Sequence, residues 1–240
     1  MIALEALSGL PEVRPGDDLA ALLAAAGDLR PGDVLAVAHK VVSKAEGRVV
    51  RLADVTPGSR ATALAVEQGR DPRQVEVILS ETAELVRADA GRLICRTHHG
   101  FVCANAGVDA SNTGEPDAVV LLPLDPDASA RVLRAALGSA IVITDSFGRA
   151  WRNGQCEVAI GCAGLVALED WRGRPDGNGR PLAATVIAVA DEVAAAADLV
   201  RTKDSREPAV RVRGLERHVG ASDGPGAGEL VRAREDDLFR

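Results

Sequence analysis

Two stretches of the sequence contain polar residues of the kinds that bind metal ions and phosphates. They are THHGFVCANAGVDASN at residues 97–112 and VITDSFGRAWRNG at residues 142–154. Asp109 in the first and Asp145 in the second lie among small residues, and Ser146 follows Asp145 directly. Because Mg²⁺ and Mn²⁺ prefer oxygen ligands, we predict that the two stretches share a divalent cation site. The alternative is that each aspartate is only a turn or cap residue.

Several basic residues could bind an anionic group close to such a cation. Lys44 follows a predicted buried strand and could contact a phosphate as a point charge, whereas Arg149 and Arg152 could each bind a phosphate or carboxylate through paired hydrogen bonds. A further basic cluster occurs within residues 201–206. The alternative for all of them is a solvated surface position.

His98 and His99 raise the question of a zinc site or a general base. Consecutive side chains on a strand point in opposite directions, so two adjacent histidines are poorly placed to share one metal ion. The four cysteines show no paired C-x-x-C spacing, and we interpret them as small buried thiols instead of zinc ligands.

The elements that must position these residues follow from apolar runs and from capping residues. A buried strand is predicted to end at Asp145, and the polar residues after another strand are expected at or beyond its end. Predicted strands and helices are mixed along the chain without strict alternation, which favours an α+β fold over a doubly wound sheet. Helices are predicted to begin at Asp17 or Asp18, to cover 58–70, to cover 71–87 with Asp71 as the cap and Pro72 in the first position, to begin at Asp125 with Pro126, and to follow Asp191 as a cap. Strands are predicted over Val34–Ala38, on both sides of His98–Gly100, over 117–124, up to Asp145, and over 183–190.

Composition excludes several classes of function. With 240 residues, of which 47% are hydrophobic and 2% aromatic, the chain can bury a core but offers no stacking platform for single-stranded nucleic acid. A net charge of −7 also disfavours binding to a polyanion. There is no leader segment and no apolar run of the roughly 20 residues that span a membrane, so we expect a cytoplasmic protein. Without a G-x-G-x-x-G or P-loop motif, a nucleotide would have to be bound by other means.

Six longer motifs occur in the order found in one known family. They are GLPEVRPGDDL, HKVVSKAEGR, DPRQVEVILSE, THHGFVCANAGVDASN, ITDSFGRAWRNGQ and VADEVAAAADLV, and together they extend over almost all of the chain. The chain resembles the coenzyme F420-0:L-glutamate ligases, also called F420:γ-glutamyl ligases. The resemblance implies an α+β fold with two unlike, interleaved subdomains in a single ligase domain over residues 1–240, and an intertwined homodimer. It does not extend to the C-terminal flavin-dependent reductase domain of some actinobacterial relatives.

The resemblance also implies an activity. Family members add L-glutamate to the phospholactyl carboxylate of the deazaflavin F420-0, through an acyl phosphate formed from GTP, and some continue with γ-linked glutamates. The reaction uses Mg²⁺ or Mn²⁺, with K⁺ as a further candidate cation. By this resemblance Lys44 contacts the phosphates of the nucleotide. We further expect Arg149 and Arg152 to hold acidic groups of the substrate, so Lys44, Arg149 and Arg152 are the expected catalytic residues.

Particular residues take binding roles by the same resemblance. Asp109 and Asp145 are expected to ligate one metal ion and Ser146 a second. Two positions depart from the family pattern: His39 stands where a small hydroxyl residue is usual, and Lys203 where many members have glutamine. The expected nucleotide-binding residues are Leu10, Pro11, Glu12, Val13, His39, Lys44, Asn112, Arg201, Thr202, Lys203, Asp204, Ser205, Arg206, Glu207 and Pro208.

Two other functions remain open from the sequence. A metal-dependent nucleotide phosphohydrolase would use the same aspartates with water as the nucleophile and would release phosphate from GTP without glutamate. A non-catalytic GTP-binding module would bind GTP tightly and form no ligated product.

Overall fold

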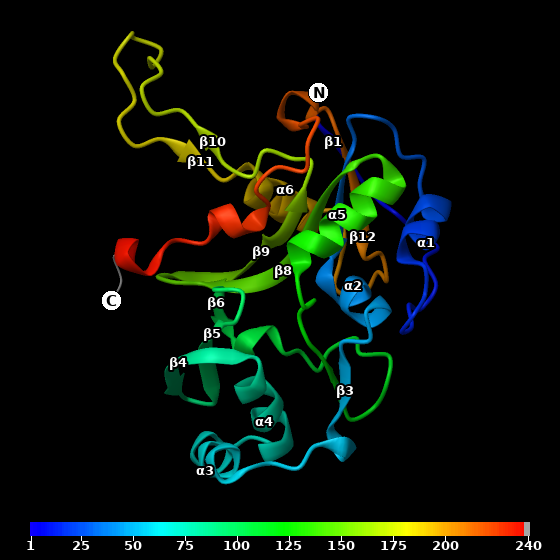
Figure 1. The fold of residues 1–240 in the computed structure, drawn as a ribbon, viewed down its shortest axis with the longest axis vertical. Helices are drawn as coiled ribbons and strands as arrows, with labels where there is room; N and C mark the ends of the chain where they lie inside the picture. Colours follow the sequence, from blue (N-terminus) through cyan, green and yellow to red (C-terminus); the bar gives the residue numbers. More distant parts are fainter. Residues whose placement is uncertain (238–240) are drawn as a thin grey trace.

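A five-stranded sheet with helices on both faces forms the centre of the molecule (Figure 1). The computed structural model describes residues 1–237. The strand order is β1-β12-β2-β8-β9, in which β2 and β8 run parallel and the other neighbouring pairs run antiparallel. The strands are β1 (Ala3–Ala6), β2 (Val34–Ala38), β8 (Ala140–Arg149), β9 (Arg152–Ala163) and β12 (Ala209–Arg213).

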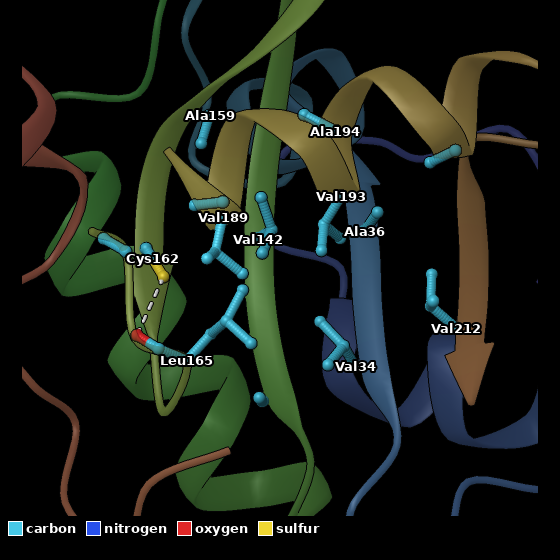
Figure 2. Packing of buried hydrophobic residues seen from close by; sticks show 14 of the residues in the cluster. Val34, Ala36, Val142, Ala159, Cys162, Leu165, Val189, Val193, Ala194 and Val212 are labelled. Atoms are coloured by element: carbon cyan, nitrogen blue, oxygen red, sulfur yellow. Dashed lines mark hydrogen bonds between the residues drawn. The ribbon is translucent and has the colours of Figure 1, made fainter. Parts of the chain in front are cut away.

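Alternate side chains of the central strands contribute to two different cores, as expected for a sheet that is covered on both faces. Val34 and Ala36 of β2 pack with α6 (Figure 2), whereas Leu35 and Val37 pack with α1, α2 and α5 on the opposite face. The sheet is therefore buried on both sides at β2 and β8. The four helices are α1 (Leu19–Ala26), α2 (His39–Ala45), α5 (Pro126–Leu137) and α6 (Val189–Asp198).

Residues between β3 and β7 pack around a third hydrophobic cluster, in the lower part of Figure 1. This part consists of a two-stranded sheet, a three-stranded sheet of order β4-β5-β6, and two helices. The elements are β3 (Val49–Arg51), α3 (Ser59–Gln68), α4 (Pro72–Ser80), β4 (Thr82–Asp89), β5 (Arg92–Thr97), β6 (Val102–Ala104) and β7 (Ala118–Val120).

A narrow arm extends from the body of the molecule after β9, at the upper left of Figure 1. It contains the short antiparallel pair β10 (Glu169–Asp170) and β11 (Val186–Ile187). Across residues 1–237, none of the helices combines the length and the apolar character that crossing a membrane requires. The 3-10 helices are η1 (Leu52–Asp54), η2 (Asn105–Gly107), η3 (Glu216–His218), η4 (Ala227–Leu230) and η5 (Arg234–Asp236).

Aspartate caps begin three of the helices where the sequence predicts them. Asp18, Asp71 and Asp125 each accept a hydrogen bond from a backbone N–H of the first helical turn, and Pro72 and Pro126 follow two of these caps. The predicted α+β class is confirmed. The two interleaved subdomains and the homodimer stay predictions.

Four predicted boundaries are wrong. The helix predicted over 71–87 covers only Pro72–Ser80, because Thr82–Asp89 form strand β4, which pairs with β5. β8 does not end at Asp145: it continues to Arg149 because β9 pairs with it along a long hairpin. The strand predicted over 117–124 covers only Ala118–Val120. The strand predicted over 183–190 covers only Val186–Ile187, because Val189 already begins α6 and is buried against the sheet; Ala188 therefore occupies the cap position predicted for Asp191.

Candidate functional site

The N-terminal end of α2 lies where β2 ends, beside the parallel strand β8. Ala38 pairs with Thr144, so His39 and Asp145 emerge next to each other. His39 is buried, with 2% of its surface exposed. Its Nδ1 lies 3.3 Å from Ser43 Oγ, and its Nε2 lies 3.3 Å from Asp145 Oδ1. The distance from Nε2 to Asp145 is short enough for an ion pair, but the two groups are not oriented for a hydrogen bond. Within residues 1–237 this buried nitrogen therefore has no hydrogen-bond partner.

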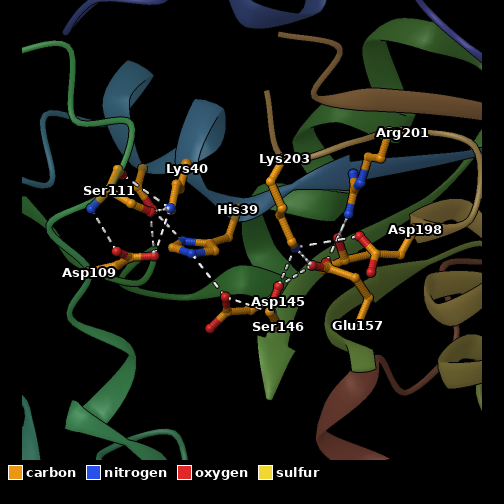
Figure 3. Close-up of polar contacts among 12 residues, drawn as sticks. His39, Lys40, Asp109, Ser111, Asp145, Ser146, Glu157, Asp198, Arg201 and Lys203 are labelled. Carbon is orange, nitrogen blue, oxygen red and sulfur yellow. Dashed lines mark hydrogen bonds and ion pairs between the residues drawn. The ribbon is translucent and has the colours of Figure 1, made fainter. Parts of the chain in front are cut away.

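Lys40 joins α2 to the loop that contains Asp109 (Figure 3). Lys40 Nζ lies 2.6 Å from Asp109 Oδ2 and donates to Ser111 Oγ at 2.6 Å. The Ser111 N–H donates to Asp109 Oδ1 at 2.7 Å. Burial alone would raise the pKa of Asp109, but the hydrogen bonds from Lys40 and Ser111 outweigh it and lower the pKa. Asp109 is therefore held as a carboxylate.

Glu157 is a buried carboxylate at the centre of a second polar cluster. It lies on β9, opposite Ser146 of β8, and accepts a hydrogen bond from the Ser146 hydroxyl. Arg201 Nη2 donates to Glu157 Oε2 at 2.8 Å and to Thr144 Oγ1 at 2.6 Å. Burial alone would raise the pKa of Glu157, but Arg201 is the main cause that lowers it. The ion pair with Arg201 thus offsets the cost of burying the Glu157 carboxylate.

Lys203 brings a second cation to Glu157. Its Nζ lies 3.0 Å from Glu157 Oε1, 2.6 Å from Ser146 Oγ and 3.4 Å from Asp198 Oδ1. Burial alone would lower the pKa of Lys203, but Glu157 outweighs this and raises it. The side chain is nevertheless 67% exposed, whereas Glu157 is only 4% exposed. Lys203 therefore approaches the buried carboxylate from the solvent side.

Lys44 lies on α2 one turn after Lys40 and contacts the predicted nucleotide-binding segment near the N-terminus. Its Nζ lies 2.5 Å from Glu12 Oε1. A Cβ added at Gly114 would meet Glu12 Oε1 at 2.6 Å, so a glycine leaves room for this pair. Of the neighbouring predicted residues, Val13 is buried, Leu10 is half-buried and Pro11 is exposed. Asn112 follows Ser111 with a φ of 54°.

The predicted nucleotide-binding loop 201–208 is attached at both of its ends. Arg201 Nη1 donates to the Pro208 carbonyl at 3.1 Å, and the same carbonyl accepts from Ala38 N–H at 2.8 Å. The loop therefore closes beside the end of β2. Inside it, the Thr202 hydroxyl donates to Asp204, the Ser205 hydroxyl donates to the Thr202 carbonyl, the Glu207 N–H donates to Ser205 Oγ, and Arg206 has a φ of 59°.

Not every predicted residue joins these contacts. Arg149 and Arg152 are exposed near the tip of the β8–β9 hairpin, and Arg149 donates to the Asn153 carbonyl at 2.6 Å. His98 Nε2 lies 3.2 Å from the Ser80 carbonyl, and His99 Nε2 lies 3.0 Å from the Pro123 carbonyl. The two histidines thus make separate backbone contacts.

The oxygen donors suit a hard divalent cation, although basic side chains already contact them. Asp109 is paired with Lys40, Asp145 faces His39, and the Ser146 hydroxyl is bonded to Lys203. In the part of the chain that the structure describes, no group of three or more histidine, cysteine, aspartate or glutamate side chains could hold a metal ion. The metal ligands stay predictions.

Sequence reasoning missed Glu157, which links Arg201, Lys203 and Ser146. The available signal was a single carboxylate in the otherwise small and apolar run CEVAIGC. In a strand buried on both faces, such a carboxylate requires a buried partner. The signal did not identify Arg201 as that partner, because the two residues are 44 positions apart.

A pocket of about 580 Å³ adjoins Glu157 between the β8–β9 hairpin and the beginning of α6. Polar and apolar side chains line this pocket, and one of them, Glu157, also belongs to the polar contacts drawn in Figure 3. Its lining includes Phe147, Arg149, Glu157, Val158, Asp191 and Glu192.

Comparison with known proteins gives consistent matches over the length of the chain. Residues 9–214 match the model of the F420-0:γ-glutamyl ligase family. A Methanopyrus kandleri protein named coenzyme F420:L-glutamate ligase is 46% identical, covering 95% of this chain and 94% of the relative. Proteins of the same name from Methanothermobacter thermautotrophicus and Halobacterium salinarum are 43% and 45% identical, covering 100% and 98% of this chain and 99% and 94% of those relatives. The chain belongs to the F420-0:γ-glutamyl ligase family.

Proposed function

We propose that this protein is a GTP-dependent ligase that joins the amine of L-glutamate to the phospholactyl carboxylate of coenzyme F420-0. Family membership supports the ligase activity, since its relatives are named for it. Addition of further γ-linked glutamates is part of the same proposal. So is the homodimer, which sedimentation of the purified protein tests.

One structural observation carries the proposal: a line of charged and polar side chains, called the charged line below, brings together segments far apart in the sequence. Lys40 contacts Asp109, its neighbour His39 faces Asp145, and Ser146 connects through Lys203 to Glu157 and Arg201. Phosphoryl transfer needs fixed charges of both signs around the reacting group. The charged line supplies charges of both signs.

The residues of the chain have distinct tasks in this proposal. Lys44, close to the segment of Glu12, binds the phosphates of GTP, and loop 201–208 borders the nucleotide. Asp109 and Asp145 would hold a divalent cation, with Ser146 as ligand of a second. When bound, Mg²⁺ or Mn²⁺ neutralises negative charge on the phosphates. K⁺ is a further candidate cation.

The reaction requires activation because a free carboxylate does not react with an amine. The phospholactyl carboxylate attacks the γ-phosphorus of GTP, and the bond to GDP breaks, which gives an acyl phosphate. The glutamate amine then attacks the acyl carbon, and phosphate leaves. No protein nucleophile is required, which agrees with a site made of carboxylates and cations. Arg149 and Arg152 bind acidic groups of the substrates.

Mass spectrometry tests this function directly. Purified protein is incubated with GTP, Mn²⁺, L-glutamate and F420-0, and the products are compared with those of Asp109→Asn. We expect a mass gain of one or more glutamate units that is lost in the variant. Without such a gain in the wild-type protein, phosphate release would identify a nucleotide phosphohydrolase, and GTP binding without turnover would identify a binding module.

A further inference from the structure

The pocket beside Glu157 combines charged groups of both signs with apolar walls. Phe147, Val158 and Val186 supply apolar surface, Arg149 supplies a cation, and the first turn of α6 supplies two carboxylates. At about 580 Å³ it has the size of a site for a small molecule. Because Glu157 belongs to both the pocket and the charged line, a ligand in the pocket lies next to that line.

Asp191 is the half-buried carboxylate of this pocket. Its Oδ1 accepts one hydrogen bond, from Ala159 N–H at 2.9 Å. Within residues 1–237 no lysine, arginine or histidine nitrogen lies within 4.0 Å of it, in contrast to Glu157, which has two cations. Burial raises the pKa of Asp191. A half-buried carboxylate with one partner favours a ligand that brings a positive charge or a proton.

We propose that this pocket binds the L-glutamate co-substrate, with Asp191 receiving its α-ammonium group and then a proton from it, and with Arg149 binding a carboxylate. This rests on the proposed ligase function. L-Glutamate carries one positive group and two negative groups on a short apolar chain. In the pocket Asp191 can meet the positive group, Arg149 one of the negative groups, and the apolar walls the short chain. Of the other two carboxylates, Glu157 is already paired with Arg201 and Lys203, and Glu192 is exposed to solvent.

The proton transfer completes the chemistry of amide formation. The ammonium group has no lone pair, so it must lose one proton before it can attack, and Asp191 takes that proton. The amine nitrogen then bonds to the acyl carbon, and the carbon–oxygen bond to phosphate breaks with its electron pair on the phosphate. The second proton leaves with the phosphate, and Asp191 returns its proton to water. General base catalysis of this kind contributes about 10² to 10⁴ in rate.

Asp191→Asn is a suitable variant because the asparagine Oδ1 can still accept from Ala159 N–H, so the structural bond is retained. The matched control is Asp89→Asn, which changes an exposed aspartate of β4 that pairs with Arg87. Each protein is assayed with GTP, Mn²⁺ and F420-0, once with L-glutamate and once with hydroxylamine. Hydroxylamine is a neutral nucleophile that captures the activated carboxyl group as a hydroxamate without an ammonium-binding group.

We expect Asp191→Asn to lose glutamate ligation about 100-fold or more while it forms hydroxamate at the wild-type rate and keeps its melting temperature. Asp89→Asn should match the wild type in both assays. Wild-type glutamate turnover in Asp191→Asn would overturn the proposal, and so would an equal loss of both products. If the wild type forms neither product, the proposed ligase function itself has failed, which is a separate outcome.

Discussion

The Lys203 ammonium group lies 2.6 Å from the Ser146 hydroxyl oxygen and connects the loop after α6 to β8. The same nitrogen contacts Glu157 and Asp198. A positive charge thus already lies beside Ser146, the residue expected to ligate a second metal ion. A divalent cation bound at Ser146 would have to displace Lys203 or be repelled by it.

Lys203→Gln should therefore strengthen binding of a second Mn²⁺ ion. The substitution removes the positive charge and keeps a side chain that can offer an oxygen. Calorimetric titration with Mn²⁺ in the presence of GTP should show a lower dissociation constant, or an additional bound ion, in Lys203→Gln. Lys203→Arg, which keeps the charge, serves as the control. Identical titrations for the wild type and Lys203→Gln would contradict the expected competition.

Glu157→Gln should destabilise the protein strongly. The change leaves the buried Arg201 guanidinium without its carboxylate, a loss that typically costs about 3–5 kcal/mol. Guanidinium chloride denaturation measures the change in free energy of unfolding. As a comparison, Asp170→Asn breaks the exposed pair with Arg172 and should leave the denaturation midpoint unchanged. Similar midpoints for Glu157→Gln and the wild type would show that the buried pair adds nothing to stability.

The same pair makes stability dependent on acid. The pKa of Glu157 is lowered in the folded protein from its ordinary value of 4.5, chiefly by Arg201 against the opposing effect of burial. A lowered pKa gives stability that is fully present above 4.5 and is lost as the pH falls toward the folded-state pKa. Melting temperatures recorded between neutral pH and pH ~3 should therefore fall less steeply in Glu157→Gln than in the wild type. Parallel curves would assign the acid sensitivity to other carboxylates.

Arg152→Ala should weaken binding of an anionic substrate. A hydrogen bond to a charged group contributes about 1.5–3 kcal/mol, so we expect the KM of F420-0 or L-glutamate to rise about tenfold or more. The side chain is exposed on the hairpin, so the fold should be unaffected. Steady-state kinetics with each substrate varied in turn identify which one Arg152 binds. Unchanged KM values for both would remove Arg152 from this role.

Gly161→Ala should destabilise the contact between β9 and α5. An added Cβ would lie 2.4 Å from the Pro126 carbonyl oxygen, which is backbone and cannot rotate away. Such overpacking typically costs about 1–3 kcal/mol. Gly177→Ala is the control, because a Cβ there meets no atom within 4 Å. Thermal unfolding should show a lower midpoint for Gly161→Ala alone; a midpoint equal to that of the control would mean that the strand shifts without cost.

Local signals in the sequence predicted much of the fold. Asp71 with Pro72 and Asp125 with Pro126 identify helix starts because capping depends on adjacent residues. The run VIAVA before Asp191 misled the prediction, since a short apolar segment fits a buried strand and a buried helix equally well. The buried pair of Glu157 and Arg201 could not be predicted, because it depends on how distant strands and loops come together.

The position of β12 has a consequence for biosynthesis. This strand, Ala209–Arg213, lies between β1 and β2 in the sheet although it is the last to be translated. On the ribosome β1 therefore lacks its neighbouring strand, and β2 lacks its neighbour on that side, until β12 has left the exit tunnel. The segments that contain the charged line would then come together only after Ala209–Arg213 has been made. Nascent chains truncated before β12 should accordingly be targets for chaperones.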